Sequence, residues 1–257
     1  DMRYLGGKGK IGRRLADAIL TDMSVKRFGH VLELCAGGGN MTYRLADRAA
    51  HVTAVEAHKG LVEMHSKVQS GWVPPTVVTR DEHAAAIDPT DSLHAFIRFA
   101  CSFSGVWGSG YIENLPAQTK ITRERGKSPR VMNVGPQSWA ADTSRLLVKA
   151  RRANVTWVHG DALTCDVPDG VNIVYIDPPY EGTTGYRCVA RAAPGAWWRR
   201  AVQIAVTGVP VYMSEASGPP DGVKARLVLS HALGQRRMHT GSAERIELLW
   251  RVGEQCY

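Results

Sequence analysis

Residues 31–40 read Val-Leu-Glu-Leu-Cys-Ala-Gly-Gly-Gly-Asn, and this stretch decides the fold. Its apolar first half predicts a short buried strand, and the following residues 41–50 have the pattern of a helix. The glycines between them let the backbone approach a ligand closely at the carboxyl end of a parallel strand. This order predicts an α/β fold with a doubly wound, mostly parallel sheet. The candidate ligand-binding residues of the loop are Glu33, Ala36, Gly37, Gly38 and Gly39.

A second short strand is expected over residues 51–55, and it ends at Glu56. A carboxylate about twenty residues past a glycine turn is placed to bind ribose hydroxyls. The dinucleotide pattern G-x-G-x-x-G would need a glycine where Thr42 stands, and no G-x-x-x-x-G-K-[ST] phosphate loop follows. We therefore expect the ribose-bearing cofactor to be S-adenosylmethionine rather than a nicotinamide nucleotide or ATP.

The other informative stretch is Ile176-Asp177-Pro178-Pro179-Tyr180, directly after the apolar residues 171–175. An exocyclic amine on a nucleobase is a poor nucleophile because its lone pair is delocalised into the ring, so a catalyst must accept hydrogen bonds from the amine hydrogens. The Asp177 carboxylate and the Pro178 carbonyl can accept them, and the two prolines hold this corner rigid. The residues therefore predict an amino-group methylation site, although Asp-Pro-Pro is also a common loop at the end of a strand.

Tyr180 completes the predicted catalytic corner. Its ring offers a flat face for a base that has been pulled out of the stack. Because this role needs the ring and not the hydroxyl, we expect replacement of Tyr180 by Phe to be mild and replacement by Ala to be severe.

With these motifs identified, the chain resembles the alpha-group DNA adenine-N6 methyltransferases. That family has a lysine-bearing N-terminal motif, the glycine loop, a target-recognition insertion and the D-P-P-Y motif, in this order. The N-terminal motif here is Arg3-Tyr4-Leu5-Gly6-Gly7-Lys8. The resemblance implies a Rossmann-like methyltransferase sheet, with Tyr4 and Lys8 near the methionine end of the cofactor and Gly7 as a further contact.

The resemblance extends to His159-Gly160-Asp161-Ala162, which follows the strand-like residues 155–158. It implies that Asp161 contacts the cofactor's adenine, with Ala162 beside it, and that Asp177 also lies at the cofactor. The chain departs from the family in the glycine loop. Members often have a Pro-Phe pair and fewer glycines there, so the details of methionine binding can differ.

Length and composition agree with one enzyme made of a core and an insertion. No run of about eighteen apolar residues suggests a membrane span. The histidines lack ligand spacing, so no metal is expected. No Pro-Cys pair is present, which argues against a cytosine-C5 methyltransferase. Five scattered cysteines without a C-x-x-C pair indicate neither a zinc site nor a disulfide framework, and they fit a reducing cytoplasm: Cys35, Cys101, Cys165, Cys188 and Cys256.

The net charge of +8 is unevenly distributed. Residues 118–152 contain nine basic side chains and only two acidic ones, Glu124 and Asp142, which gives +7 for this segment alone. Such a segment is typical of a surface that binds a phosphate backbone, although a solvated surface loop is the commoner outcome for an isolated charge run. The residues expected to bind DNA are Trp107, Arg123, Arg125, Lys127 and Arg130.

Motif placement divides the chain into a catalytic domain of residues 1–60 and 150–257 and a target-recognition insertion of residues 61–149. Helices are expected over residues 61–70, 80–87 and 91–103, the last capped by Asp91. Residues 103–111 resemble the family's aromatic-glycine link to the recognition hairpin. Residues 119–134 fit either a β-hairpin or a disordered basic loop. A long hairpin of residues 223–230 and 244–252 would complete the sheet.

These observations favour methylation of the 6-amino group of adenine in double-stranded DNA, with the target base flipped out and the protein acting as a monomer or weak dimer. Methylation of cytosine N4 is the closest alternative because that amine makes the same chemical demands. A basic DNA-binding module that merely retains the fold is the other. RNA and protein-glutamine methyltransferases are less favoured, because they more often resemble Asn-Pro-Pro-Tyr and residue 177 is Asp.

Overall fold

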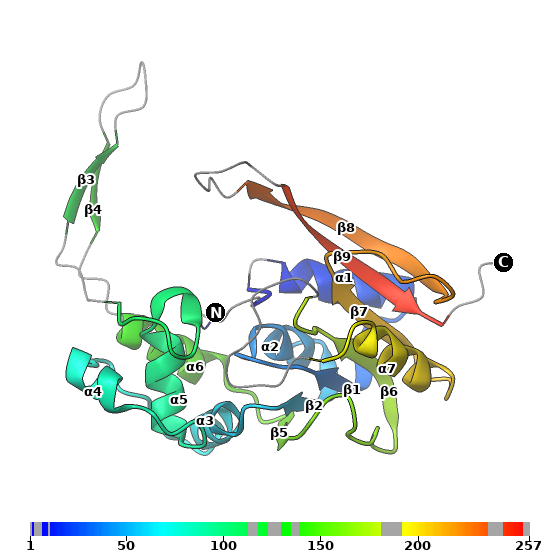
Figure 1. The fold of residues 1–257 in the computed structure, drawn as a ribbon, viewed down its shortest axis with the longest axis horizontal. Coiled ribbons are helices and arrows are strands. Elements are labelled where there is room, and N and C mark those ends of the chain that lie inside the picture. The colour runs from blue at the N-terminus through cyan, green and yellow to red at the C-terminus, as the bar shows by residue number, and fades with distance from the viewer. Residues whose placement is uncertain are drawn as a thin grey trace.

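The computed structural model describes residues 2, 7–9, 11–112, 118–122, 130–134, 139–180, 192–235 and 244–253. A seven-stranded sheet with the order β5-β2-β1-β6-β7-β9-β8 forms the centre of the molecule (Figure 1). Its strands are β1 Phe28–Leu34, β2 Ala49–Glu56, β5 Val155–His159, β6 Val171–Ile176, β7 Val211–Glu215, β8 Ala225–Gln235 and β9 Glu244–Val252. This confirms the predicted α/β sheet and the closing hairpin.

Five of these strands are parallel, and β9 runs antiparallel between β7 and β8. The register places Leu34 of β1 beside Val55 of β2 and beside Ile176 of β6. The glycine loop, Glu56 and Asp177 therefore all leave the sheet at one edge. Because β9 is antiparallel, its first residues lie at that same edge, where the parallel strands end.

Two apolar layers cover the sheet because its central strands are apolar on both faces. Val31 and Ile173 point to one face, where they pack with residues of α1 (Gly12–Asp22) and α2 (Asn40–Ala46). Leu32 and Val174 point to the other face, which α7 (Ala196–Ala205) covers. Helix α1 buries Leu15, Ala16 and Ile19, a spacing that forms one helical face.

A group of helices extends the molecule beyond β5, on the left of Figure 1. These are α3 Lys59–Gln69, α4 Arg80–Ala85, α5 Ser92–Ala100 and α6 Trp139–Ala150, with the short 3-10 helix η1 Phe103–Gly105. They share an apolar core that includes Met64, Phe96 and Leu147. The pair β3 (Gln118–Thr122) and β4 (Arg130–Val134) forms a separate antiparallel sheet that projects from this side.

Local signals explain why the helices of this group begin where they do. The Asp91 carboxylate accepts a hydrogen bond from the His94 N–H and caps α5, as predicted. At α4, Thr79 and Glu82 form a capping box. The three helices predicted for residues 61–103 are thus confirmed with small shifts at their ends. Of the stretch 119–134, the described residues belong to the paired antiparallel strands β3 and β4, which favours the β-hairpin over a disordered loop.

Helices α1 and α6 were not predicted. The start of the chain was interpreted only through its lysine motif, and α6 lies within the stretch interpreted as a basic segment. Helix α6 buries Ala140, Thr143, Ser144 and Leu147 on one face, so its basic residues belong to a packed amphipathic helix.

Candidate functional site

The glycine loop makes a tight turn between β1 and α2. Gly37 and Gly39 have φ values of 54° and 74°, and Gly39 is the N-cap of α2. A Cβ at Gly39 would lie 3.0 Å from the Tyr43 ring and 3.1 Å from Trp157. Cys35, which opens the loop, also has a positive φ of 65°, a strained conformation that is uncommon for a residue with a side chain. The loop therefore needs glycine and stores strain at its start.

Glu56 fixes the shape of this loop from the neighbouring strand. Its Oε2 accepts a hydrogen bond of 2.7 Å from the Gly37 N–H, and its Oε1 accepts one of 2.8 Å from the His58 N–H. Burial raises the pKa of the Glu56 carboxyl, and these N–H groups oppose the shift. Each carboxylate oxygen can accept a further bond, so the expected contact with ribose hydroxyls is compatible with these contacts.

Glu33 is a second buried carboxyl beside the loop. It is 1% exposed, and its Oε2 has no hydrogen-bond partner within the part of the chain that is described. Burial raises its pKa to about 8, and the carboxylates of Asp177 and Glu56 add to the shift. A bound cation would favour the ionised form of such a group.

These features fit S-adenosylmethionine. A glycine turn allows close approach, a carboxylate ends β2, and buried acidic groups near Glu33 suit the cationic methionine end of this cofactor. Glu33, Gly37, Gly39 and Glu56 are the residues that would hold it. The predicted Asp161 follows β5, and its Oδ1 accepts from the Leu163 N–H, while Ala162 is buried beside it.

The Asp177-Pro178-Pro179-Tyr180 corner lies at the same edge, because the Asp177 N–H donates to the Leu34 carbonyl at 3.2 Å. Lys8 Nζ lies 2.6 Å from Asp177 Oδ1, and Lys8 is only 4% exposed. The structure thus brings the lysine of the N-terminal motif into direct contact with the predicted catalytic carboxylate, although they are far apart in sequence. Tyr4 lies outside the described residues.

The N-terminal segment is held at this place by backbone and side-chain contacts. The Lys8 carbonyl accepts hydrogen bonds from the N–H groups of Ile11 and Gly12, which lie at the start of α1. Further upstream, the Asn40 amide at the start of α2 donates to the Met2 carbonyl at 3.0 Å. Gly7 is exposed. Lys8 is therefore positioned by helices on both sides of it.

Tyr180 contacts the same lysine. Its hydroxyl lies 2.8 Å from Lys8 Nζ and donates to Glu247 Oε1 at 2.6 Å. Lys8 Nζ also lies 3.3 Å from Glu247 Oε1 and 4.7 Å from the centre of the Tyr180 ring. Glu247, a buried carboxylate on β9, was not among the predicted site residues. The four side chains Lys8, Asp177, Tyr180 and Glu247 are called the lysine cluster below.

The lysine cluster changes the titration of Asp177. Burial raises the pKa of the Asp177 carboxyl to about 6, with Glu247 adding to the rise and Lys8 opposing it. The pKa of Lys8 is raised because its two carboxylate neighbours outweigh the effect of burial. At neutral pH the cluster therefore contains an ionised Asp177 and a charged Lys8. Lys8 contacts Oδ1 of Asp177, and each carboxylate oxygen can accept more than one hydrogen bond, so this carboxylate can also accept one from a substrate.

Of the residues predicted to contact nucleic acid, Trp107 has its side chain in the described part of the chain. Trp107 is half-buried, with its ring centre 5.0 Å from that of His58 and 5.7 Å from that of Phe99. This places it near the end of β2. The side chains of Arg123, Arg125, Lys127 and Arg130 lie outside the described part of the chain, although Arg130 begins β4.

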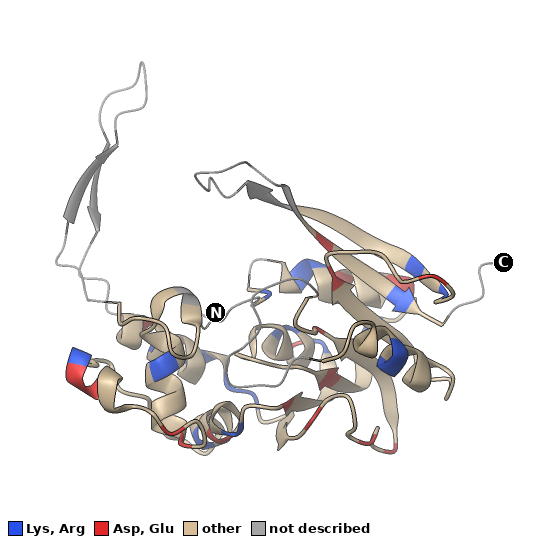
Figure 2. Cartoon of the chain, in the orientation of Figure 1, with Lys and Arg blue, Asp and Glu red and all other residues tan. Residues whose placement is uncertain are grey.

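Part of the basic segment is used within the protein. Arg152 pairs with Asp47 at 2.9 Å, and Arg145 pairs with Asp142 at 2.9 Å. Elsewhere in the described ranges, Lys and Arg are spread over several helices and the β8–β9 hairpin, without one dominant stripe (Figure 2). The charge of residues 118–152 is therefore not all available to a phosphate backbone.

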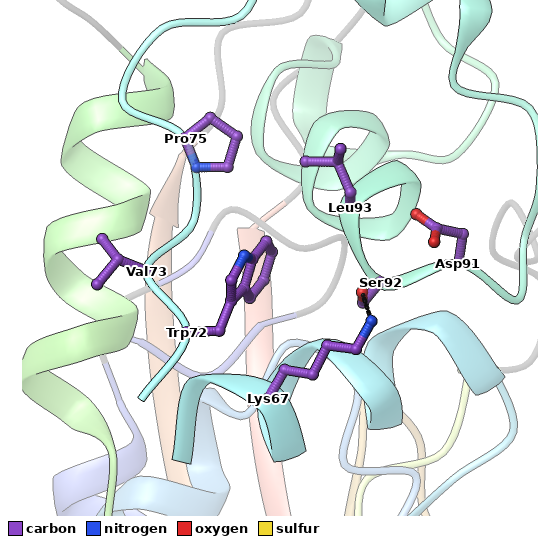
Figure 3. Close-up of a pocket in the computed structure, with 7 residues that line it drawn as sticks. All are labelled: Lys67, Trp72, Val73, Pro75, Asp91, Ser92 and Leu93. Atoms are coloured by element: carbon purple, nitrogen blue, oxygen red, sulfur yellow. Dashed lines mark hydrogen bonds between the residues drawn. The ribbon is translucent and has the colours of Figure 1, made fainter. Parts of the chain in front are cut away.

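An open pocket of about 660 Å³ lies on the helical side of the molecule (Figure 3). Lys67 donates to the Ser92 hydroxyl at 2.7 Å at one side, and Trp72, Val73, Pro75, Asp91 and Leu93 complete the lining. The end of α3 is tied to the start of β5, because the Gln69 amide donates to the Val155 carbonyl. The pocket thus lies toward the amino ends of the strands, away from the lysine cluster.

Neither a metal site nor a membrane-spanning helix is present in the described ranges. They contain no group of three or more His, Cys, Asp or Glu side chains arranged to hold a metal ion. Among the helices described, none is long and apolar enough to cross a membrane.

Residues 11–102 match the family model described as ribosomal RNA adenine dimethylase. The match runs from α1 to the end of α5 and covers just over a third of the chain. No curated protein matches. Together with the strand order and the glycine loop, this match indicates a class I methyltransferase fold, and the methyltransferase assignment implies S-adenosylmethionine as the cofactor.

Solved structures with a similar fold include several RNA methyltransferases. A putative RNA methyltransferase from Pyrococcus horikoshii has a TM-score of 0.44 and 11% identity, covering 95% of this chain and 82% of that one. The 23S rRNA methyltransferase ErmE has a TM-score of 0.42 and 14% identity, with 96% of this chain and 68% of that one covered. A dimethyladenosine transferase from Plasmodium falciparum has a TM-score of 0.40 and 10% identity, with 93% of this chain and 61% of that one covered. These resemblances are distant, and the strand order rather than these scores defines the fold.

Proposed function

We propose that this protein transfers a methyl group from S-adenosylmethionine to the 6-amino group of adenine in double-stranded DNA. The observation that carries the proposal is the Asp177 carboxylate, which is held by Lys8 at the edge of the sheet beside the glycine loop. A carboxylate oxygen can accept more than one hydrogen bond, so Asp177 can also accept one from an amine, as the chemistry of an exocyclic nitrogen requires.

The residues have separate roles in this proposal. Asp177 and the Pro178 carbonyl accept the amine hydrogens, so that the nitrogen lone pair points away from the ring plane. Tyr180 positions the flipped base. Glu33, Gly37, Gly39 and Glu56 bind the cofactor, which supplies an electrophilic methyl group. Holding two reactants in attack geometry can lower a barrier by roughly 7–11 kcal/mol.

Methylation of adenine in RNA is the second candidate, and the match to the ribosomal RNA adenine dimethylase model favours it. That match ends at residue 102 and so does not include the Asp177 corner. Asp at position 177 supports DNA, by resemblance to the D-P-P-Y motif of the alpha-group enzymes. Methylation of cytosine N4 makes the same chemical demands on the site.

The test is methyl transfer from methyl-labelled cofactor to unmodified genomic DNA and to unmodified ribosomal RNA, followed by mass spectrometry of the nucleosides. We expect N6-methyladenine in DNA. Detection of N6-methyladenine only in RNA would establish the second candidate. Detection of N4-methylcytosine would show that cytosine is the target base. Transfer to neither polymer would refute the proposal.

Asp177→Asn keeps the shape of the side chain and should lower turnover by about 10²–10⁴-fold, the range for a positioned side chain that takes part in proton transfer. Cofactor affinity should change little, because the carboxylate is proposed to act on the amine. Asp169→Asn is the matched control, since Asp169 is an exposed carboxylate just before the same strand. Similar turnover in both variants would remove Asp177 from its assigned role.

We also propose that the basic residues within 118–134 bind the nucleic-acid backbone. An alanine substitution at Arg123, Arg125 or Lys127 that removes one phosphate-binding side chain should flatten the plot of log affinity against log salt by roughly 0.9. Substituting a residue that reads a base should instead reduce discrimination between cognate and scrambled duplexes by about 1–3 kcal/mol. We expect Arg123, Arg125 or Arg130 to behave in this second way. Unchanged slopes and discrimination would assign recognition to another surface.

A further inference from the structure

Glu247 is a buried acid on β9, a strand that mixes charged and apolar residues. It is 2% exposed and pairs with His231 of β8, one residue before the point where β9 begins to pair with β7. Removing a carboxylate from water costs several kcal/mol unless partners compensate. The side chains that contact Glu247 therefore indicate why a carboxylate is buried at this position.

Both described side-chain partners of Glu247 belong to the proposed site. The Tyr180 hydroxyl donates to Oε1 at 2.6 Å, which is the length of a charge-assisted O–H···O⁻ bond. Lys8 Nζ lies 3.3 Å from the same oxygen. One carboxylate oxygen thus links the residue proposed to stack on the base with the residue that holds Asp177.

Sharing one ammonium between two carboxylates has a chemical consequence. Lys8 is closer to Asp177, at 2.6 Å, than to Glu247, at 3.3 Å. If Lys8 paired with Asp177 alone, its charge would be fully directed at the carboxylate that must accept a substrate hydrogen. A second carboxylate divides that charge and leaves Asp177 a better acceptor.

We propose that Glu247 is a positioning residue for the methyl-transfer site, holding the Tyr180 hydroxyl and the Lys8 ammonium so that the Tyr180 ring and the Asp177 carboxylate keep their places for the target amine. It acts through Tyr180 and Lys8 and has no contact with the base or the cofactor in this role. The inference rests on the proposed function, which it deepens by naming the part that aligns the catalytic corner.

Several elements contribute titratable groups that face Asp177, and a pH-dependent test must consider all of them. They are Lys8 from the segment before α1, Glu33 and Cys35 from β1 and its end, Tyr175 from β6, Tyr180 from the following loop, and Glu247 from β9. Replacing only Glu247 by Gln changes one charge and leaves the others in place. The amide oxygen can still accept hydrogen bonds from Tyr180 and Lys8.

The decisive measurement is the titration of the Asp177 carboxyl by carbon NMR, with its signal assigned through its loss in Asp177→Asn. In Glu247→Gln the midpoint should move to lower pH than in the unchanged protein, because a neighbouring negative charge is removed. The acid limb of kcat should move in the same direction. An Asp177 midpoint and an acid limb that both stay in place would overturn the proposal.

Turnover provides the second measurement. Glu247→Ala should lower kcat by about tenfold or more, as expected for loss of a charge-assisted hydrogen bond in the aligned state. The calorimetric dissociation constant for S-adenosylmethionine should stay unchanged. Tyr180→Phe should add little to Glu247→Ala, because the bond is already lost, but should reduce turnover further in Glu247→Gln. Fully additive losses in both backgrounds would contradict the link between the two residues.

Asp22→Asn is the matched control, because Asp22 also accepts from a tyrosine hydroxyl at 2.6 Å and lies at the other end of α1. It should leave kcat and the Asp177 midpoint unchanged. If Glu247→Ala does not fold, the Asp177 titration in Glu247→Gln still tests the proposed role of Glu247. The titration needs no substrate, so it reports on Glu247 even if the protein methylates neither DNA nor RNA.

Discussion

Two clusters of similar composition lie near the two ends of α1, and they have opposite electrostatics. In the lysine cluster, the Tyr180 hydroxyl donates to Glu247 at 2.6 Å. At the end of α1, the Tyr212 hydroxyl donates to Asp22 at 2.6 Å, and Arg226 and Arg251 pair with the same carboxylate at 2.7 and 3.1 Å. Asp22, Tyr212, Arg226 and Arg251 are called the arginine cluster below.

Strand β9 connects the two clusters. Glu247 and Arg251 are four residues apart, so they point to the same face of the strand and lie about 13 Å from each other. Helix α1 has eleven residues and is therefore about 16 Å long, which is enough to run from one cluster to the other. Each end of α1 therefore lies at a cluster that contains a tyrosine, a carboxylate and a cation.

The lysine cluster and the arginine cluster differ in their balance of negative and positive charge. The lysine cluster has two carboxylates and one cation, all largely buried, and the pKa of Asp177 is raised to about 6 by burial and by Glu247. The arginine cluster has one carboxylate and two cations. Burial alone would raise the pKa of Asp22, but hydrogen bonds from Tyr212, Arg226 and Arg251 lower it. An arrangement that raises the pKa of a carboxyl is typical of a functional site, and one that lowers it stabilises the fold.

The largest effect is expected from Lys8→Met. It removes the one cation that contacts Asp177 and Glu247 among the described residues, and loss of a partner from a buried ion pair costs about 3–5 kcal/mol. The loss should be smaller at pH 5 than at pH 8, because Asp177 then binds a proton. Denaturant unfolding at both pH values measures it.

Lys59→Met is the control for this experiment, since Lys59 is an exposed lysine at the start of α3. It should change the free energy of unfolding little at either pH. A Lys8→Met protein with the stability of this control would mean that the lysine cluster does not hold the N-terminal segment in place.

The two tyrosines give the next effect. Tyr180→Phe and Tyr212→Phe each remove a hydroxyl that donates to a carboxylate, which is buried for Glu247 and half-buried for Asp22. Each should lower the free energy of unfolding by about 1–3 kcal/mol. Only Tyr180→Phe should also reduce methyl transfer. This replaces the expectation of a mild effect, which considered the ring of Tyr180 and not its hydroxyl. Equal turnover in the two variants would show that the Tyr180 hydroxyl has no part in the reaction.

Local patterns were sufficient to predict much of this fold. The run from β1 through the glycine loop to α2 is apolar, then glycine-rich, then helical, and each step has its own signal. Asp91 marked the start of α5 in the same way. The Asp177 corner was also proposed as a site from its residues alone, because two prolines and an acid after an apolar run are a compact pattern.

What could not be predicted depends on long-range contacts. Glu247 stands between Ile246 and Leu248 in a strand where alternation alone does not assign it a partner, and only folding brings it to Lys8 and Tyr180. An acid followed directly by the apolar residues Leu248, Leu249 and Trp250 is the signal that could have drawn attention to it. Arg152 was interpreted by its charge, but its partner Asp47 is 105 residues away in the sequence and became evident only in the folded structure. The pair of Arg145 and Asp142 is local, three residues apart, and would have followed from recognising α6.

The pH dependence of stability should also separate the clusters. A carboxyl with a raised pKa binds a proton more readily in the folded state, so Asp177 makes the protein less stable as the pH rises from about 4 to about 6. The pKa of Asp22 is lowered, so its contribution is present above its unfolded value and is lost as the pH falls below it. Unfolding free energies measured over pH should show that Asp177→Asn removes the first trend and Asp22→Asn the second. If both variants flatten the pH dependence of the unfolding free energy over the same pH range, the opposite pKa shifts assigned to Asp177 and Asp22 are wrong.

The smallest effect concerns salt. Arg226 is 43% exposed, so its pair with Asp22 is partly screened and Arg226→Gln should cost no more than about 1 kcal/mol. This cost should shrink between about 0.05 M and 1 M salt, because the screening length falls to about 3 Å. The cost of Lys8→Met should barely change over the same range, since Lys8 is 4% exposed and its partners are buried. Denaturant unfolding of both variants at the two salt concentrations tests the difference. An equal response to salt would mean that solvent reaches both clusters alike, and the contrast in burial would then fail to explain the contrast in their pKa values.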